Sequence, residues 1–461
     1  MKAKVSTLIF FLILIIGTFL RFYNINYDNF WIDETITFWV ANPDFSIKES
    51  FLKHRSFEQV PYLFNFIIKI YFQIFGYEFN YSRLIPALFA SLSIVSVSYI
   101  SRQLSNDQSY IFTAILISLN IYLISYAQEL RLYSTLFFLS SISIIFFLNF
   151  ENKQKLISFY FFILSLLFTS LIHPFGLILY FSFVISEFKF FKKDNEHNFQ
   201  KIISYLVLFL VIFLYYSLQF NEQYLSPGWI QQIDIKFFTN FYFSNFFGSR
   251  IVGLIYLITL LFLLIKFFKT LLENKKLFLL FSILILSYSL PLLYGLLFRP
   301  IIIPRYIIFV IIPIIILTSY FIFQLKLVIK NYIIAFLVLI TFLNLTTEQT
   351  FKQFYNERFS YKPDFEGALK NIYESQNTNY SISINLEQKK ISHLWEESIK
   401  NYINFISKKN NYNLTNISYD KNLDNIWLIC IHDLNMNKCN LTDKKLIKTI
   451  KLNRIDLNLI P

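Results

Sequence analysis

The chain contains 461 residues, of which 55% are hydrophobic and only 15% are charged, and its mean hydropathy is +0.49. A soluble protein of this length needs more charge to cover its surface, so we predict a polytopic membrane protein. The net charge of +13, from 42 basic and 29 acidic residues, is then explained by basic residues beside membrane spans rather than by nucleic acid.

The first hydrophobic run covers about residues 5–22. It is longer than the apolar region of a typical signal peptide and lacks a small-residue cleavage site, so we expect an uncleaved first span. A loop, residues 23–82, follows it. Its stretches 35–41 and 61–75 are aromatic and look helical, and the second, which contains Lys69, is predicted to lie at the membrane interface.

Ten further apolar runs recur after this loop. A helix needs about 20 residues to cross a bilayer, and with the first span these runs predict about eleven transmembrane helices. Their predicted limits are 83–101, 109–127, 131–150, 156–173, 174–190, 202–220, 250–268, 277–297, 304–323 and 332–346. An odd number of spans places the two ends of the chain on opposite sides of the membrane.

Loop charges give the predicted orientation. With the N-terminus in the cytoplasm, nearly every short cytoplasmic loop contains a basic pair or cluster, as the positive-inside rule requires. The opposite loops instead contain acids, a histidine and single arginines, which are Asp33, Glu34, Glu129, Arg131, His173, Glu222, Arg250, Arg299 and Arg305. We therefore predict a polar site on the outer face of a plasma or inner membrane.

The composition of the C-terminal segment, 347–461, is closer to that of a soluble protein. PDFEGALKNIYES has helical spacing, and NYSISIN and NIWLICI have the composition of strands. We expect a small α/β domain outside the cytoplasm, attached to a membrane module of residues 1–346. Cys430 and Cys439 both fall in this domain, and a disulfide and a buried, unpaired Cys430 are equally consistent with the pattern.

Two adjacent carboxylates, Asp33 and Glu34, follow the first span. Carboxylates beside a bilayer are costly unless they are used, and a partly desolvated carboxylate suits the base that removes a proton from an attacking hydroxyl. By spacing alone, Asp33 is at least as well explained as the N-cap of a helix that starts at Thr35, with Glu34 favoured by the helix dipole. The other outer polar residues favour catalysis by Asp33, with Glu34 as its partner.

Arg305 and Tyr306 stand at the outer end of a predicted span, and Arg299 lies six residues before Arg305. If a donor sugar is attached to a lipid phosphate, cations here would bind the anionic leaving group. Snorkelling to lipid headgroups is the alternative. It explains Arg299 equally well, whereas Pro304 and Tyr306 on either side of Arg305 favour function.

Other outer polar residues are weaker candidates. Glu129 and Arg131 begin a span, where an interfacial polar and aromatic belt is an equal alternative. His173 falls between two spans, and a lone histidine is more often structural. His54 and Arg55 in the first loop are further candidate phosphate contacts. These scattered residues form no recognisable metal site, and a requirement for a divalent metal stays open.

The order of the motifs is more specific than any one of them. W-x-D-E follows the first span, a helix ends at Gly76, Arg83 and Pro86 open a span, and ELRLYS, HPFG and PRY stand at outer ends. In this order the chain resembles multispan glycosyltransferases of the GT-C type. The nearest groups are the bacterial dolichyl-phosphate-mannose-protein mannosyltransferase-like family and the aminoarabinose transferases of lipid A. The resemblance covers about residues 1–320 in layout.

The resemblance implies a catalytic pair, a phosphate-binding pair and a cavity-lining pair, which are Asp33 and Glu34, Arg305 and Tyr306, and Glu129 and Arg131. One departure concerns the first loop. Related proteins usually have a Pro-Pro pair there, often after Lys or His, and this chain retains only Pro61. Lys53, His54 or Arg55 would then have to supply the basic residue that binds phosphate.

We therefore expect an α-helical GT-C-type membrane enzyme. It would move a hexose- or pentose-type sugar from a polyprenyl-phosphate donor, with inversion, to a glycolipid, glycan or protein acceptor. The particular sugar, the acceptor and the oligomeric state stay open. A transporter or flippase is the alternative and predicts charges at mid-span, whereas the charges here stand at span ends. A non-catalytic scaffold, the third hypothesis, predicts that removal of 347–461 abolishes all function.

Overall fold

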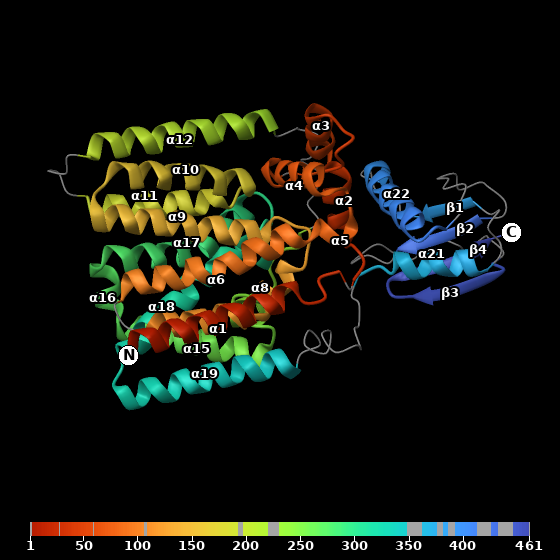
Figure 1. Cartoon of the computed structure of the whole chain (residues 1–461). Coiled ribbons are helices and arrows are strands. Elements are labelled where there is room, and N and C mark those ends of the chain that lie inside the picture. Colours follow the sequence, from red (N-terminus) through yellow and green to blue (C-terminus); the bar gives the residue numbers. More distant parts are fainter. Residues whose placement is uncertain are drawn as a thin grey trace.

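The structure is a computed structural model that describes the chain except for residues 1, 27, 59, 106–107, 192–196, 220–229, 348–361, 376–380, 386–391, 413–425, 432–445 and 461. Figure 1 shows two parts, a bundle of long helices and a small α/β unit near the C-terminus. Four short helices lie between them, at one end of the bundle.

The bundle contains α1 (Lys2–Phe22), α6 (Leu84–Leu104), α7 (Ser109–Ser118), α8 (Ile121–Ala127), α9 (Tyr133–Lys153), α10 (Leu156–Ile172), α11 (Gly176–Lys189), α12 (Asn198–Gln219), α15 (Arg250–Lys266), α17 (Lys275–Leu297), α18 (Ile311–Phe323) and α19 (Leu327–Thr347). Short elements between them are α13 (Ile235–Asn240), α14 (Phe243–Phe246), α16 (Phe268–Glu273) and the 3-10 helix η2 (Pro304–Val310). The four outer helices are α2 (Ile32–Val40), α3 (Ile47–Phe57), α4 (Leu63–Phe75) and α5 (Phe79–Ser82).

The apolar runs form long helices because a helix satisfies its own backbone hydrogen bonds, which lipid cannot do. Within the described part of the chain, seven helices are long and apolar enough to cross a membrane, or eight if α7 and α8, bent by 56°, form one span. The predicted spans 156–173, 174–190 and 250–268 form helices of 17, 14 and 17 residues. The count of eleven stays a prediction.

The bundle has a buried centre and an apolar rim. In the segment Pro304–Phe323, 83% of the residues in an 18-residue stretch are buried, against 17% for α1 and for α19. Exposed side chains of α1 include Leu8 and Phe11, as a lipid-facing surface requires. Arg305 therefore lies at the start of the most enclosed span.

The helix expected in the stretch 61–75 is confirmed, and it holds a buried lysine. The stretch 61–75 forms α4, which ends at Gly76 with φ of +99°. Lys69, in the middle of α4, is buried and donates to the carbonyls of Asn42 and Phe45, both at 2.6 Å. It thereby fixes the turn after α2. That α4 lies at the membrane interface stays a prediction.

The C-terminal unit contains α21 (Phe365–Glu374), α22 (Ser392–Lys409) and four strands, β1 (Ser381–Asn385), β2 (Ile426–Ile431), β3 (Lys448–Leu452) and β4 (Ile455–Ile460). The sheet order is β1-β2-β4-β3, with β1 and β2 parallel and the other pairs antiparallel. The predicted strands are confirmed as β1 and β2. Cys430 in β2 is buried and forms a disulfide, and Cys439 lies outside the described residues.

α22 joins this unit to the outer helices (Figure 1). The Tyr402 hydroxyl donates to Asn29 Oδ1 (3.3 Å) and accepts from the Phe30 amide (3.1 Å). The Tyr402 ring also stacks on Phe30, with the ring centroids 4.8 Å apart. The hydroxyls of Thr35 and Ser398 lie 3.2 Å apart. The C-terminal unit therefore packs directly on the helix that carries the two candidate catalytic carboxylates.

Candidate active site

The first turn of α2 carries both carboxylates. Trp31 is the N-cap, and its backbone amide donates to Glu34 Oε2 at 2.9 Å. Because Glu34 supplies this acceptor, the helix starts at Ile32 and Asp33 lies inside its first turn. The alternative in which Asp33 is the N-cap of a helix that starts at Thr35 is therefore wrong.

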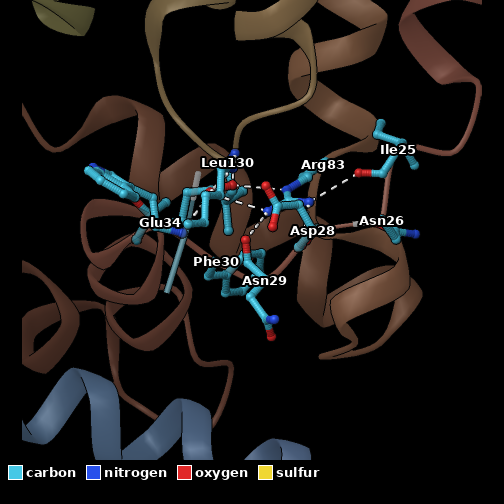
Figure 2. Close-up of polar contacts among 12 residues, drawn as sticks. Ile25, Asn26, Asp28, Asn29, Phe30, Glu34, Arg83 and Leu130 are labelled. Carbon is cyan, nitrogen blue, oxygen red and sulfur yellow. Dashed lines mark hydrogen bonds and ion pairs between the residues drawn. The ribbon is translucent and has the colours of Figure 1, made fainter. Parts of the chain in front are cut away.

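Glu34 is fully buried and surrounded by donors (Figure 2). Arg83 donates through Nε to Oε1 (2.9 Å) and through Nη2 to Oε2 (3.2 Å). The backbone amide of Leu130 donates to Oε1 at 2.8 Å. Lys362, from the segment before α21, donates to Oε2 at 2.6 Å. The cluster joins α2, the start of α6, the loop before α9 and the C-terminal unit at one point.

Arg83 uses its remaining donors to hold the segment after α1. Its Nη1 donates to the carbonyls of Ile25 (3.1 Å) and Asp28 (3.0 Å), and its Nη2 to that of Asn29 (3.0 Å) (Figure 2). Loops normally leave such carbonyls to water, so one buried guanidinium here replaces several water contacts. The path from α1 to α2 is thereby fixed.

The charge state of Glu34 follows from this environment. Burial alone would raise the pKa of its carboxyl, but Arg83 and Lys362 lower that pKa to about 2. The carboxylate is therefore ionised, and its oxygens already accept four donor groups besides the Trp31 cap. A carboxylate in this condition is better explained as a structural anchor than as the predicted catalytic partner of Asp33.

Asp33 faces a different environment, although it is the next residue. Its Oδ2 lies 3.1 Å from Arg305 Nη1, and both side chains keep about a fifth of their surface exposed (20% and 21%). Arg305 comes from η2, which begins the most buried span. The structure therefore brings together the predicted base and the predicted phosphate ligand, which lie 272 positions apart in the chain.

Arg131 approaches the same turn from the loop before α9. Its Nη1 donates to Glu58 Oε1 (2.5 Å), the Asp33 carbonyl (3.0 Å) and Thr37 Oγ1 (3.1 Å). Glu58 stands in the first-loop stretch where related proteins have a Pro-Pro pair. This chain thus places an acid against Arg131 at that position.

Aromatic rings enclose the cations. The Arg305 guanidinium lies over the rings of Tyr133 and Tyr306, at 5.6 and 5.9 Å from their centroids. The Tyr306 ring also contacts His173, with centroids 4.7 Å apart, and Phe175, at 5.6 Å. Rings on these sides exclude water from Arg305 and strengthen its attraction for an anion.

Glu129 lies close to these groups without joining either cluster. Among the described residues its carboxylate accepts no hydrogen bond. Burial raises the pKa of this carboxyl, against the opposing effect of Lys362 and with a further rise from Glu34. A carboxyl in this environment keeps its proton to a higher pH than an ordinary glutamate does.

Three predicted phosphate contacts lie elsewhere. His54 donates from Nε2 to the Val60 carbonyl (2.7 Å) and accepts from Asn65 at Nδ1 (2.8 Å). Arg55 donates from Nε to the Gln219 carbonyl at 3.3 Å. Arg299 lies in the extended segment before η2, and no recorded contact within the described residues joins it to Asp33. The structure does not bring these three into the site.

Lys53 and His54, two of the residues considered as replacements for the basic residue near the missing Pro-Pro pair, make contacts outside the site. Lys53 lies 3.9 Å from both Glu49 and Glu397, with its ammonium 4.5 Å from the centroid of the Trp39 ring. His54 is buried, and burial lowers the pKa of its imidazole, so it is neutral. Within the part of the chain that the structure describes, no group of three or more His, Cys, Asp or Glu residues could hold a metal ion.

Comparisons with known proteins identify the fold. The family profile for dolichyl-phosphate-mannose-protein mannosyltransferase matches residues 59–218, which is less than half of the chain. The crystal structure of ArnT from Cupriavidus metallidurans in the apo state matches 100% of this chain and 98% of its own, with a TM-score of 0.63 and 11% identity. The fold is that of the GT-C-type glycosyltransferases. The resemblance predicted from the motifs is thereby confirmed, and the chain is a multi-pass membrane protein.

Two further structures have the same fold. ArnT from Cupriavidus metallidurans bound to undecaprenyl phosphate matches 100% of this chain and 98% of its own, with a TM-score of 0.60 and 10% identity. The archaeal oligosaccharyltransferase AglB from Archaeoglobus fulgidus, in complex with an inhibitory peptide and a dolichol-phosphate, has a TM-score of 0.52 and 11% identity. The match covers 93% of this chain and 69% of that one. Among curated proteins, none matches this chain in sequence.

Three residues of these clusters were not predicted from the sequence, namely Glu58, Arg83 and Lys362. Arg83 was noted only as the start of a span, and its position directly before an apolar run is shared by arginines that snorkel to lipid headgroups. Nothing local distinguishes Glu58 or Lys362 from other loop charges. Their partners come from distant parts of the chain.

Proposed function

We propose that the chain is a membrane glycosyltransferase that moves a sugar from a polyprenyl-phosphate donor to an acceptor on the outer face of the membrane. The observation that carries this proposal is the pairing of Asp33 with Arg305 at 3.1 Å. Asp33 can take a proton and Arg305 can bind a phosphate. Both side chains are partly exposed, where the first turn of α2 meets the start of the most buried span. The fold shared with ArnT, which one structure shows with undecaprenyl phosphate, supports the choice of donor.

The proposed reaction is a single displacement at the anomeric carbon of the donor sugar. An acceptor hydroxyl or amine attacks the anomeric carbon as the bond from that carbon to the phosphate oxygen breaks. Asp33 takes the proton of the attacking group, and the electron pair of the broken bond stays on the phosphate, beside Arg305. A single displacement of this kind inverts the anomeric configuration.

The other site residues support these two. Arg131 holds the backbone of Asp33 through the carbonyl contact at 3.0 Å, which fixes the turn that presents the carboxylate. Tyr133 and Tyr306 enclose the Arg305 guanidinium, which lowers the local dielectric where the phosphate would bind. Glu129 is a second carboxyl in reach of the same space and lines the cavity in this proposal.

The placement in the membrane follows from the loop charges. We propose an N-terminus in the cytoplasm, a module of residues 1–346 in a plasma or inner membrane, and an extracytoplasmic unit of residues 347–461. The disulfide of Cys430 is consistent with an oxidising compartment. A hexose or pentose as the sugar, and a glycolipid, glycan or protein as the acceptor, fit this site equally.

The proposal is tested with the purified protein reconstituted in liposomes. A panel of undecaprenyl-phosphate sugars is supplied, and released undecaprenyl phosphate is measured with and without extracts of candidate acceptors. Acceptor-dependent release from one donor, with an inverted product, is the expected result. Movement of the donor across the bilayer with no release from any donor would overturn the proposal in favour of a flippase.

A further inference from the structure

His173, like His54, is a buried histidine at the outer end of the bundle. The two differ in the hydrogen bonding of one ring nitrogen. His173 ends α10, where its side chain is only 2% exposed. Its Nδ1 accepts the backbone N–H of Phe175 at 3.1 Å. Its Nε2 is buried and, within the part of the chain that the structure describes, has no hydrogen-bond partner. His54, by contrast, uses both ring nitrogens in hydrogen bonds.

The contact with Phe175 determines where the proton of the ring lies. A nitrogen that accepts a backbone N–H carries no hydrogen, so the neutral imidazole of His173 has its proton on Nε2. Burial, together with Arg131 and Arg305, lowers the pKa of this imidazole to about 3. The ring therefore stays neutral near pH 7. It is a hydrogen-bond donor and not a proton shuttle.

An unsatisfied buried donor is costly, and such groups occur where a ligand completes the hydrogen bonding. The surroundings indicate the charge of that ligand. The His173 ring packs on Tyr306, which flanks Arg305, and Arg131 also has an unpartnered buried donor, its Nε. Two arginines and two unused N–H groups favour an anion with several acceptor oxygens.

We propose that the Nε2–H of His173 donates to a non-ester oxygen of the lipid phosphate and positions the leaving group beside Arg305. This inference rests on the proposed function, because it assigns a further phosphate contact to the same site. A neutral donor suits the task. It adds a directed hydrogen bond without adding a third positive charge to a site that already contains two arginines.

Two substitutions separate the two ring nitrogens. His173→Asn keeps an acceptor near the position of Nδ1, which can satisfy the Phe175 amide, but loses the distal donor. His173→Gln keeps a distal N–H and loses the proximal acceptor. His197→Gln is the matched control, because His197 lies before α12 with its ring 6.4 Å from that of Phe150, at the opposite end of the bundle.

The experiment measures the affinity of each full-length variant for undecaprenyl phosphate, which has no sugar, and kcat and KM with the active donor. His173→Asn should bind undecaprenyl phosphate about tenfold more weakly or worse, because a hydrogen bond to a charged group is lost. His173→Gln should recover much of that affinity, and His197→Gln should equal the wild type.

Three other outcomes would contradict the proposal or the function on which it rests. Wild-type affinity in His173→Asn overturns the proposal and leaves Nε2–H against the Tyr306 ring as a structural contact. If His173→Asn binds undecaprenyl phosphate like the wild type but has a raised KM for the sugar-linked lipid, the proposal is also overturned. The Nε2–H would then contact the sugar rather than the phosphate. If the wild type binds no undecaprenyl phosphate, the proposed function itself fails.

If both variants fail to fold, the wild type still tests the proposal. The protein labelled with ¹⁵N-histidine has five imidazoles, and spectra of variants at the other four assign His173 by elimination. Addition of undecaprenyl phosphate should shift the Nε2–H resonance of His173. An unchanged resonance at saturating lipid overturns the proposal.

Discussion

The first turn of α2 contains two carboxylates, each in an ion pair, that differ in burial and in the number of hydrogen bonds that they accept. Glu34 has a side chain with no exposed surface and accepts from Arg83, Lys362 and two backbone amides. Asp33, one residue earlier, keeps 20% of its side chain exposed and has a single recorded cation, Arg305. Neighbouring residues on a helix point about 100° apart, so one turn serves both purposes. The saturated carboxylate stabilises the fold, and the open one is available for chemistry.

The largest effect on activity is expected from Asp33→Asn. An amide cannot take the proton of the acceptor, and loss of a general base typically lowers the rate about 10²–10⁴-fold. Undecaprenyl phosphate should still bind, because Arg305 is retained, and thermal unfolding in detergent should match that of the wild type. Transfer at the wild-type rate would remove Asp33 from the mechanism.

Glu34→Gln should act on stability instead. It leaves Arg83 buried without its carboxylate, and breaking a buried ion pair typically costs about 3–5 kcal/mol. We expect a lower yield and a lower unfolding temperature, with Asp33→Asn as the control from the same turn. A Glu34→Gln protein that is as stable as the wild type but inactive would reverse the roles assigned to the two carboxylates.

Lys362→Met tests the link between the C-terminal unit and this turn. Lys362 is only 12% exposed and donates to Glu34 at 2.6 Å, so its loss should cost about 1–3 kcal/mol. Hydrogen exchange in α2 and α21 should rise. Lys370→Met is the control, because Lys370 forms only an exposed pair with Glu374 at 3.8 Å. Equal exchange in the two variants would show that the contact does not hold the unit in place.

The pH dependence of stability should distinguish the same groups. The pKa of Glu34 is about 2 in the fold against an ordinary value of 4.5, so its stabilising contribution is complete above pH 4.5 and is lost as pH falls through 2. His54 and His173 have lowered pKa values and are neutral in the fold, so their protonation on unfolding costs stability from about pH 6.5 downward. In Glu34→Gln the additional loss that begins below pH 4.5 should disappear, whereas the loss that begins near pH 6.5 should remain and continue below pH 4.5. The measurement is the unfolding temperature of wild type and Glu34→Gln from pH 7 to pH 3. The same pH dependence in both proteins would contradict the role assigned to Glu34.

The outer end of the site was predictable because it depends on topology. Asp33, Arg131, His173 and Arg305 each follow or precede an apolar run on the same side, and helices that cross a membrane bring such ends together. The Asp33–Arg305 pair could therefore be expected from the order of spans alone. The burial of Glu34 was not predictable in this way, because sequence adjacency does not show which face of a helix a residue occupies; its catalytic role stays a prediction, and its contacts favour a structural one.

The partners of Glu34 and Arg131 could not be found in the same way. Lys362 lies in a polar segment after the last long helix of the bundle. Glu58 directly follows α3, which contains four other charged residues, Lys48, Glu49, Lys53 and Arg55. Which of these charges is buried depends on how α3 and the C-terminal unit pack, and that packing leaves no local pattern. Only the departure from the expected Pro-Pro pair marked the Glu58 region as unusual.

The smallest effect is expected from Arg55→Ala, which removes a cation near the outer end that takes no part in either ion pair. Its one recorded side-chain hydrogen bond is a long contact to the Gln219 carbonyl at 3.3 Å, and a contact of this kind contributes about 0.5–1.5 kcal/mol at most. Affinity for undecaprenyl phosphate should change less than about twofold, because no recorded contact joins Arg55 to Arg305. Titration of the lipid against Arg55→Ala and Arg305→Ala measures the contrast directly. A tenfold loss in both would place Arg55 among the phosphate ligands, and the open ion pair of Asp33 would then be only one part of a wider basic surface.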